Sequence, residues 1–203
     1  MNPIRFVPIG DSYTIGEGVT PEQSWPVLLT QDLQKEGIPI TLVHNPAVTG
    51  WTVQAAIEGE LPYLELEHAT FSTLLIGAND LVRGFGTATF GTRLGKLMDA
   101  MLKRLPGPRR LLVITIPDFS RTPTGAQFAS SDQIQAFNAV IKDEAEKRGL
   151  PVFDLFALSQ TMKPGDTAED GLHPSAKGYR KWESAMFSVV IELLRGLQNK
   201  KDP

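Results

Sequence analysis

A serine, a histidine and an aspartate stand at positions where they could form a hydrolytic relay. The stretch VPIGDSYTIGEG, residues 7–18, puts Ser12 just after an apolar run that ends in Gly10. A serine hydroxyl is a weak nucleophile at neutral pH and needs a neighbouring general base, which a third group orients. Ser12 is therefore either a plain turn residue or a nucleophile whose base lies elsewhere in the chain.

The chain has three histidines, and one of them has a setting that suits a general base. His44 ends an apolar run and His68 follows an acidic segment, and we expect both to be structural or surface residues. His173 lies in EDGLHPS, three residues after Asp170. At that spacing the carboxylate can fold back onto the ring, fix its tautomer and stabilise the imidazolium that forms when the ring takes a serine proton. Taken alone, the segment is explained about as well by a loop and helix cap; its pairing with Ser12 favours catalysis.

Acyl transfer also requires hydrogen-bond donors for the oxyanion that develops on the substrate carbonyl oxygen. NPAVTGW contains Gly50, where the backbone can approach a ligand closely, and GAND presents the side-chain amide of Asn79. Each residue by itself is explained as an ordinary turn residue. Their appearance after consecutive apolar runs makes them candidate oxyanion donors.

Five apolar, β-branched runs are predicted to be buried strands, and they would position these residues. The runs begin at Ile4, Ile38, Phe71, Arg110 and Leu150, and successive starts lie 33 to 40 residues apart. This spacing leaves room for a crossover helix each time, and the intervening segments carry apolar residues at helical spacings. Five such units with right-handed crossovers predict an α/β fold, a three-layer α/β/α sandwich around a parallel sheet.

In open α/β sheets, ligands bind beyond the carboxyl ends of the strands. Ser12 follows the first predicted strand, residues 45–50 follow the second, Asn79 follows the third, and Asp170 lies beyond the fifth. We therefore expect these groups to converge on one rim of the sheet.

The motifs together resemble the ordered blocks of the GDSL, or SGNH, hydrolase family. GDS at 10–12, a loop glycine at 50, GAND at 77–80 and DGLHPS at 170–175 stand in the family's order and span nearly the whole chain. The resemblance implies a flavodoxin-like fold whose five-stranded parallel sheet has the strand order 2-1-3-4-5.

The resemblance also implies a role for each motif residue. Ser12 would be the nucleophile, His173 the general base and then acid, and Asp170 the group that orients the histidine. The implied oxyanion hole consists of the N–H groups of Ser12 and Gly50 and the side chain of Asn79.

Residues near the predicted rim suit an acyl group, because binding pockets are lined mainly by apolar and aromatic side chains. Tyr13 stands where the family name implies leucine, and we expect it to shape the pocket entrance. The loops at 83–91 and 117–131 contribute Phe85 and Phe119 as further candidate substrate-binding residues. Some of the loop phenylalanines are explained equally well as core residues.

We therefore predict a serine ester hydrolase of the carboxylesterase type, which acts on small or short-acyl esters through an acyl-enzyme on Ser12. Its partners are the ester and water, and it needs no cofactor. A thioesterase, a lysophospholipase or a carbohydrate-ester deacetylase would use the same machinery. The alternative from another class is a non-catalytic flavodoxin-like binding module. The complete set of Ser12, Asp170 and His173 argues against that alternative.

Other site types have little support. Thr14 stands where a G-x-S-x-G elbow requires glycine, and no G-x-G-x-x-G or Walker loop is present. Asp11, Asp118, Asp154 and Asp170 lie near strand ends, but no ligand pair has a zinc-like spacing, so we expect no metal site.

Composition and charge limit the class of protein. With 203 residues, of which 41% are hydrophobic and 21% charged, we expect one globular domain over residues 1–203 with a frayed tail at 198–203. The net charge of -3 argues against a nucleic-acid partner. The absence of cysteine, of a signal peptide and of a membrane-spanning segment predicts a soluble cytoplasmic protein without stable membrane insertion. The prediction is compatible with a leader peptide that has already been removed. The sequence makes no prediction of the oligomeric state.

Overall fold

The computed structural model describes residues 3–199, in which strands and helices alternate. The strands are β1 (Ile4–Phe6), β2 (Ile9–Gly10), β3 (Ile40–Leu42), β4 (Ser72–Leu75), β5 (Leu111–Ile114) and β6 (Val152–Phe153). The helices are α1 (Ser12–Ile15), α2 (Trp25–Lys35), α3 (Val53–Gly59), α4 (Pro62–Leu66), α5 (Ala78–Val82), α6 (Thr87–Leu102), α7 (Ser131–Glu146), α8 (Leu155–Ser159) and α9 (Ala176–Asn199). Short 3-10 helices cover Pro21–Gln23, Pro108–Arg110, Phe119–Arg121, Gly125–Gln127 and Pro164–Asp166. The predicted alternation of strand and helix is therefore confirmed.

All strand pairs are parallel, but the strands form two sheets. The first predicted strand is divided into β1, which pairs with β3 through Ile4 opposite Ile40, and β2, which pairs with β4 through Ile9 opposite Leu74. The break includes Pro8, which has no N–H for a ladder hydrogen bond. The result is a two-stranded sheet β1-β3 and a four-stranded sheet β2-β4-β5-β6. A single five-stranded sheet in the order 2-1-3-4-5 is thus not confirmed.

In the fifth predicted run, the observed strand β6 is shorter than the apolar run. β6 ends at Phe153, and Asp154 then begins α8 by accepting a hydrogen bond from the Ala157 N–H at 3.0 Å. An aspartate at this position satisfies a helix N–H that has no partner inside the helix. The LPVFDLF run therefore changes from strand to helix at its aspartate.

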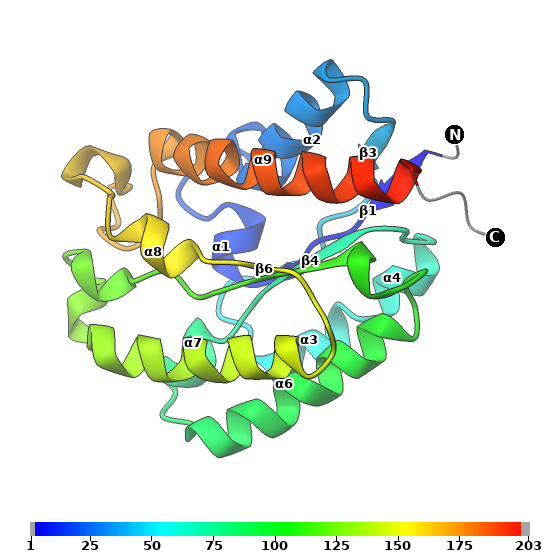
Figure 1. The fold of residues 1–203 in the computed structure, drawn as a ribbon. Helices are drawn as coiled ribbons and strands as arrows, with labels where there is room; N and C mark the ends of the chain where they lie inside the picture. The colour runs from blue at the N-terminus through cyan, green and yellow to red at the C-terminus, as the bar shows by residue number, and fades with distance from the viewer. Residues whose placement is uncertain (1–2, 200–203) are drawn as a thin grey trace.

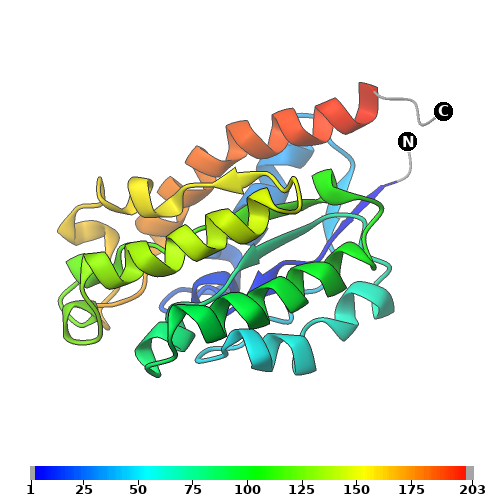
Figure 2. The ribbon, with the colours of Figure 1, turned by 60° about the horizontal axis from the view of Figure 1, so that its bottom comes forward.

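Helices cover both sides of the strands. Figure 1 shows α2 and α9 on one side and α3, α6 and α7 on the other, and the turned view in Figure 2 keeps the strands between these two groups. Within the groups, α2 packs against α9 and α6 packs against α7. This layering agrees with the predicted α/β/α arrangement.

Local sequence explains where the long helices begin and which face they bury. α7 begins with a capping box, in which Ser130 and Gln133 satisfy each other's backbone N–H groups. α9 buries Tyr179, Trp182 and Met186, whose spacing of three and four residues places them on one face. Residues 200–203 of the predicted frayed tail lie outside the described residues, and the preceding two end α9.

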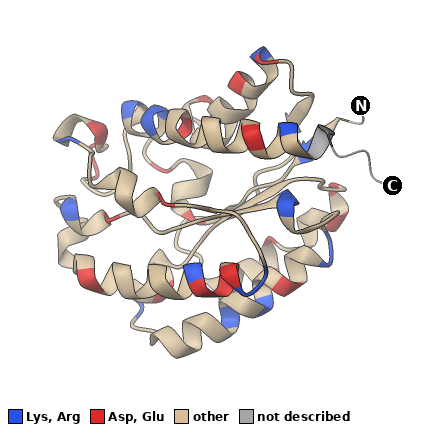
Figure 3. Cartoon of the chain, viewed as in Figure 1, with Lys and Arg blue, Asp and Glu red and all other residues tan. Residues whose placement is uncertain are grey.

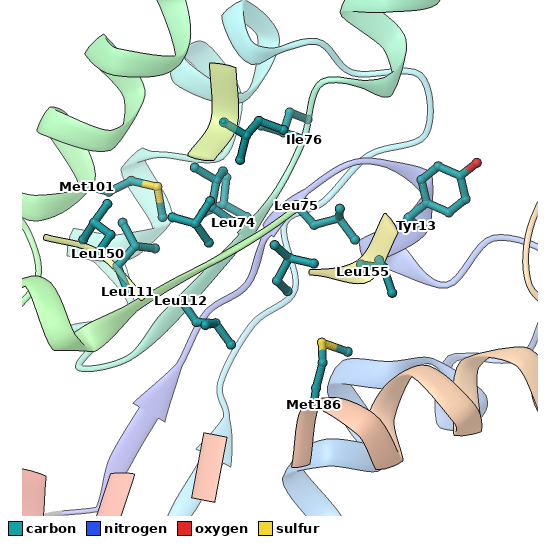
Figure 4. Packing of buried hydrophobic residues seen from close by; sticks show 14 of the residues in the cluster. Tyr13, Leu74, Leu75, Ile76, Met101, Leu111, Leu112, Leu150, Leu155 and Met186 are labelled. Carbon is teal, nitrogen blue, oxygen red and sulfur yellow. The ribbon is translucent and has the colours of Figure 1, made fainter. Parts of the chain in front are cut away.

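The central strands are buried on both faces, which explains their continuous apolar runs. Leu74 and Leu75 of β4 are at most 2% exposed and, as neighbours in a strand, point to opposite faces. Figure 4 shows them among buried side chains from both helical layers, including Met101 of α6 and Met186 of α9. The carboxyl ends of β2 and β4 are therefore held rigidly where the motif residues begin.

The outer surface carries charges of both signs. In Figure 3, Lys and Arg positions are interspersed with Asp and Glu positions along the helices, without a region of one sign in this view. Among the described residues, no helix is both long and apolar enough to cross a bilayer.

Candidate active site

The turn that carries Ser12 is built by a glycine and an aspartate. β2 ends at Gly10, and Asp11 starts α1 by accepting a hydrogen bond from the Tyr13 N–H at 3.1 Å. A Cβ at position 10 would lie 2.5 Å from the Leu75 carbonyl oxygen, so only glycine fits this close approach of β2 to β4. Ser12 is consequently presented at the carboxyl end of β2.

Tertiary folding joins Ser12 to the predicted base, which lies 161 residues further along the chain. Ser12 Oγ is 2.9 Å from His173 Nε2, and His173 Nδ1 is 2.7 Å from Asp170 Oδ2. The other carboxylate oxygen, Oδ1, accepts the N–H groups of Leu172 at 2.8 Å and His173 at 3.0 Å. Gly171, which lies between Asp170 and Leu172, adopts a φ of +68° and closes this turn.

The carboxylate environment favours the charged form of Asp170. Burial acts to raise the pKa of Asp170, but the hydrogen bonds from His173 and from two backbone N–H groups outweigh it, so that its pKa lies below the ordinary value. The ionised carboxylate accepts the Nδ1–H of His173, which leaves the Nε2 lone pair facing the Ser12 hydroxyl. The Tyr13 ring packs 5.3 Å from the imidazole, centroid to centroid, and restricts its rotation.

Asn79 also reaches the turn that carries Ser12. Its Nδ2 donates to the Trp51 carbonyl at 3.0 Å and to Asp11 Oδ2 at 3.3 Å, and the residue lines a cavity beside Ser12. Gly77, which precedes α5, has a φ of +124°, a conformation that favours glycine. The strand-to-helix turn therefore places the amide next to Asp11.

Gly50 is held in place by the segment that follows α5. It has a φ of +82°, and its carbonyl accepts a hydrogen bond from the Arg83 guanidinium at 2.9 Å. Arg83 directly follows α5, so the loop after β3 is tied to the segment that carries Asn79. Gly50 is not among the residues that line the cavity beside Ser12.

Three buried carboxyl groups, those of Asp11, Glu60 and Asp80, lie in or next to the turn that carries Ser12, and the sequence analysis did not select Glu60 or Asp80. Burial raises the pKa of Glu60 to about 9 and the pKa of Asp11 to about 7, and burial also raises the pKa of Asp80. Glu60 Oε2 accepts the Gly10 N–H at 2.8 Å, and Asp80 Oδ2 accepts the Val53 N–H at 2.9 Å. The only sequence signal for Glu60 is a glutamate between apolar residues in IEGELPYL.

A cavity of about 180 Å³ opens beside Ser12. Of the candidate substrate-binding residues, Tyr13 and Phe119 line it, but Phe85 does not. Phe85 instead packs under the Arg93 guanidinium, 4.5 Å from its ring centroid. The lining residues that the sequence analysis did not select are Ala78, Val82, Phe128 and Leu172.

The remaining titratable candidates have structural surroundings. The His44 ring stacks on Tyr63 at 4.4 Å, and His68 adopts a φ of 48° just after α4. Asp118, considered above as a metal ligand, accepts hydrogen bonds from Ser120 and Ser131. In the described part of the chain, no group of three or more His, Asp or Glu side chains is arranged to hold a metal ion.

Comparison with known proteins agrees with this architecture. The profile of the GDSL-like lipase/acylhydrolase family matches residues 9–181. An arylesterase of Vibrio mimicus is 26% identical over 194 residues, which cover 95% of this chain and 90% of the relative. Thioesterase 1/protease 1/lysophospholipase L1 of Escherichia coli K12 is 26% identical over 168 residues, which cover 82% of this chain and 74% of the relative.

A solved structure shows a similar fold. The family 3 carbohydrate esterase of Clostridium thermocellum superimposes with a TM-score of 0.79 at 24% identity, over 97% of this chain and 99% of that one. At this level of identity the likeness concerns the fold alone. The family match extends over most of the chain and includes all the motif blocks. The chain therefore belongs to the GDSL, or SGNH, family of esterases and acylhydrolases.

Proposed function

We propose that the protein is a serine ester hydrolase for short-acyl esters, which works through an acyl-enzyme on Ser12. The observation that carries the proposal is the continuous chain of short contacts from Ser12 through His173 to Asp170. A nucleophile, a base within 2.9 Å and an orienting carboxylate are the parts that nucleophilic acyl transfer requires.

In the acylation step, His173 Nε2 removes the proton from Ser12 Oγ as the oxygen attacks the substrate carbonyl carbon. The tetrahedral intermediate collapses when the bond to the leaving oxygen breaks, and His173 gives its proton to that oxygen. Asp170 stays ionised throughout and stabilises the imidazolium. In the deacylation step, His173 Nε2 takes a proton from water as the water oxygen bonds to the acyl carbon. The bond from that carbon to Ser12 Oγ then breaks, and His173 returns the proton to Ser12 Oγ, which releases the carboxylic acid.

The oxyanion is proposed to receive hydrogen bonds from the Ser12 N–H, the Gly50 N–H and the Asn79 amide. The longer of the two bonds from Asn79 Nδ2 is the one to Asp11, at 3.3 Å. We assign this hydrogen to the oxyanion in the intermediate, because hydrogen bonds to a charged acceptor are stronger than those to a neutral one. The raised pKa of Asp11, about 7, increases the fraction of its neutral form near neutral pH, so the oxyanion faces less negative charge than it would beside an ordinary aspartate.

The small cavity supports the preference for short acyl groups. Its volume is about 180 Å³, and the exposed side chains of Val82 and Phe128 stand in its lining. A thioester substrate is the second candidate, because the E. coli relative is named a thioesterase. We further propose that residues 1–203 act as one domain, and that β1 and β2 serve as one strand in a flavodoxin-like order 2-1-3-4-5.

The proposal is tested with the wild type and with Ser12→Ala. Hydrolysis of p-nitrophenyl acetate should fall by more than about a thousandfold in the variant. Intact mass spectrometry should show that a fluorophosphonate probe attaches one phosphonyl group to the wild type and none to Ser12→Ala. The matched control is Ser188→Ala, because Ser188 is exposed on α9 and contacts only its own helix through its Oγ. Equal hydrolysis by the wild type and Ser12→Ala would show that the mechanism is wrong.

A further inference from the structure

A second, larger cavity adjoins the one beside Ser12. Its volume is about 660 Å³, and its walls come mainly from residues 117–124 and 159–174. The two cavities share Tyr13, Phe119 and Leu172 in their linings. Pockets for drug-sized molecules have volumes of about 300–1,000 Å³, so the larger cavity fits a molecule of this size. The smaller cavity, at about 180 Å³, does not.

The chemistry of the proposed reaction gives the two cavities different positions. The carbonyl oxygen of an ester on Ser12 must point toward the oxyanion donors, which include Asn79. The leaving oxygen must instead come within reach of His173 Nε2, from which it takes a proton. Asp170, Gly171 and Leu172, which form the turn before His173, are a wall of the larger cavity. The larger cavity therefore lies on the leaving-group side.

We infer that the larger cavity binds the alcohol part of the ester, so that the substrate is a small acyl group on a bulky, cyclic alcohol. This inference rests on the proposed function. In the step concerned, the bond between Ser12 Oγ and the acyl carbon forms and the bond from that carbon to the alcohol oxygen breaks. The Ser12 proton passes through His173 Nε2 to the alcohol oxygen, and the neutral alcohol is left in the larger cavity.

The lining combines an apolar wall of aromatic rings with polar and charged groups that can meet ring hydroxyls. The rings of Tyr13 and Trp182 lie 5.7 Å apart, centroid to centroid, and form an apolar part of the wall. The wall also carries charged side chains, among them Arg121, Lys163 and Glu169. Asp118 accepts hydrogen bonds from two serine hydroxyls, and Asp166 is paired with Lys181. The threonines in the wall are Thr122, Thr124 and Thr167, and their polar atoms can meet ring hydroxyls.

The inference is tested by varying the two halves of the ester separately. Ethyl acetate has a small alcohol and a small acyl group; 2-naphthyl acetate and 6-O-acetylglucose keep the acetyl group and enlarge the alcohol; ethyl octanoate enlarges only the acyl group. The variant Met162→Trp adds bulk at a half-buried wall position of the larger cavity. Leu66→Trp, at an exposed position on α4, is the matched control for the added tryptophan.

For at least one of the two bulky acetates, Met162→Trp should lower the ratio of its kcat/KM to that of ethyl acetate by about tenfold or more, as steric misfit in a pocket does. Leu66→Trp should leave the ratio as in the wild type. The affected alcohol, aryl or sugar, identifies the source of the ring. If this ratio is unchanged in Met162→Trp while hydrolysis still depends on Ser12, the inference is overturned and the proposed function stands. The same holds if Met162→Trp selectively loses activity on ethyl octanoate, because that loss would put the acyl chain in the larger cavity. If the folded wild type hydrolyses none of these esters and no fluorophosphonate labels Ser12, the proposed function and the inference fail together.

A second measurement uses the wild type only and does not depend on how Met162→Trp folds. The free alcohol product, 2-naphthol or glucose, should inhibit ethyl acetate hydrolysis competitively, and ethanol at the same concentration should not. Binding of 2-naphthol should also change the tryptophan fluorescence, because Trp182 lines the cavity. Inhibition by octanoate in place of either cyclic alcohol contradicts the inference.

Discussion

Replacing the buried Glu60 by glutamine should change how the stability of the protein depends on pH. Glu60 is 0% exposed, and burial, the largest effect, raises its pKa from 4.5 to about 9. In the unfolded chain the group ionises near its ordinary pKa, whereas in the folded protein it keeps its proton. Because the folded state binds more protons, stability is greatest below pH 4.5 and is lost as the pH rises toward 9.

The size of the effect follows from the two pKa values. Each pH unit between them costs about 1.4 kcal/mol, so that ionisation of the unfolded state costs roughly 3 kcal/mol at pH 7. Glutamine cannot ionise, and its amide oxygen can still accept the Gly10 N–H that Glu60 accepts at 2.8 Å. The free energy of unfolding of Glu60→Gln relative to the wild type should therefore rise by about 4 kcal/mol between pH 5 and pH 8.

Urea unfolding followed by tryptophan fluorescence at pH 5, 6, 7 and 8 measures this difference. Glu58→Gln is the matched control, because Glu58 lies on α3 only two residues away but is exposed. Asp11 and Asp80 remain in every variant, so the comparison isolates Glu60. Parallel stability profiles for the wild type and Glu60→Gln would refute the reasoning, since they would mean that Glu60 is ionised in the folded protein.

Two further predictions concern the site itself. Asp170→Asn should lower kcat for p-nitrophenyl acetate by about 10³- to 10⁴-fold with little change in the circular dichroism spectrum, because an amide no longer fixes the His173 tautomer; activity within tenfold of the wild type would show that the carboxylate does not orient the ring. Gly10→Ala should lower the free energy of unfolding by about 2 kcal/mol or more, because the added Cβ would meet the Leu75 carbonyl oxygen at 2.5 Å. Gly86→Ala, where no atom lies within 4 Å of an added Cβ, should cost far less in the same urea titration, and equal losses would contradict the steric argument.

Much of the fold could be predicted because its signals are local. Apolar runs with helical segments between them indicate a parallel sheet, and the structure has strands in all five runs. Where the structure differs from the expected strands, a single residue interrupts an apolar run. Pro8 lies in the break in the first run, and Asp154 starts a helix inside the last one.

The candidate site shows the same division. Ser12, Asp170 and His173 could be selected from the sequence because the chemistry of each limits the residue types, and the chain has only three histidines. Phe85 does not line the cavity beside Ser12, since an aromatic residue in a loop near the rim can equally pack against a neighbour, here Arg93. Glu60 was missed, because a glutamate beside apolar residues, as in IEGELPYL, does not by itself show that its side chain will be buried.

The sequence by itself therefore determined the order of strands and helices, the family and the residues capable of the chemistry, all of which depend on residue type and short-range spacing. Only the tertiary structure decided that Ser12 Oγ lies 2.9 Å from His173 Nε2, that the carboxyl groups of Asp11, Glu60 and Asp80 are buried around the turn that carries Ser12, and that two cavities of unequal size lie beside these residues. The physical reason is that distances, burial and cavity shape depend on how segments far apart in the chain pack together. That packing also fixes the dielectric surroundings that shift the pKa values of Asp11 and Glu60.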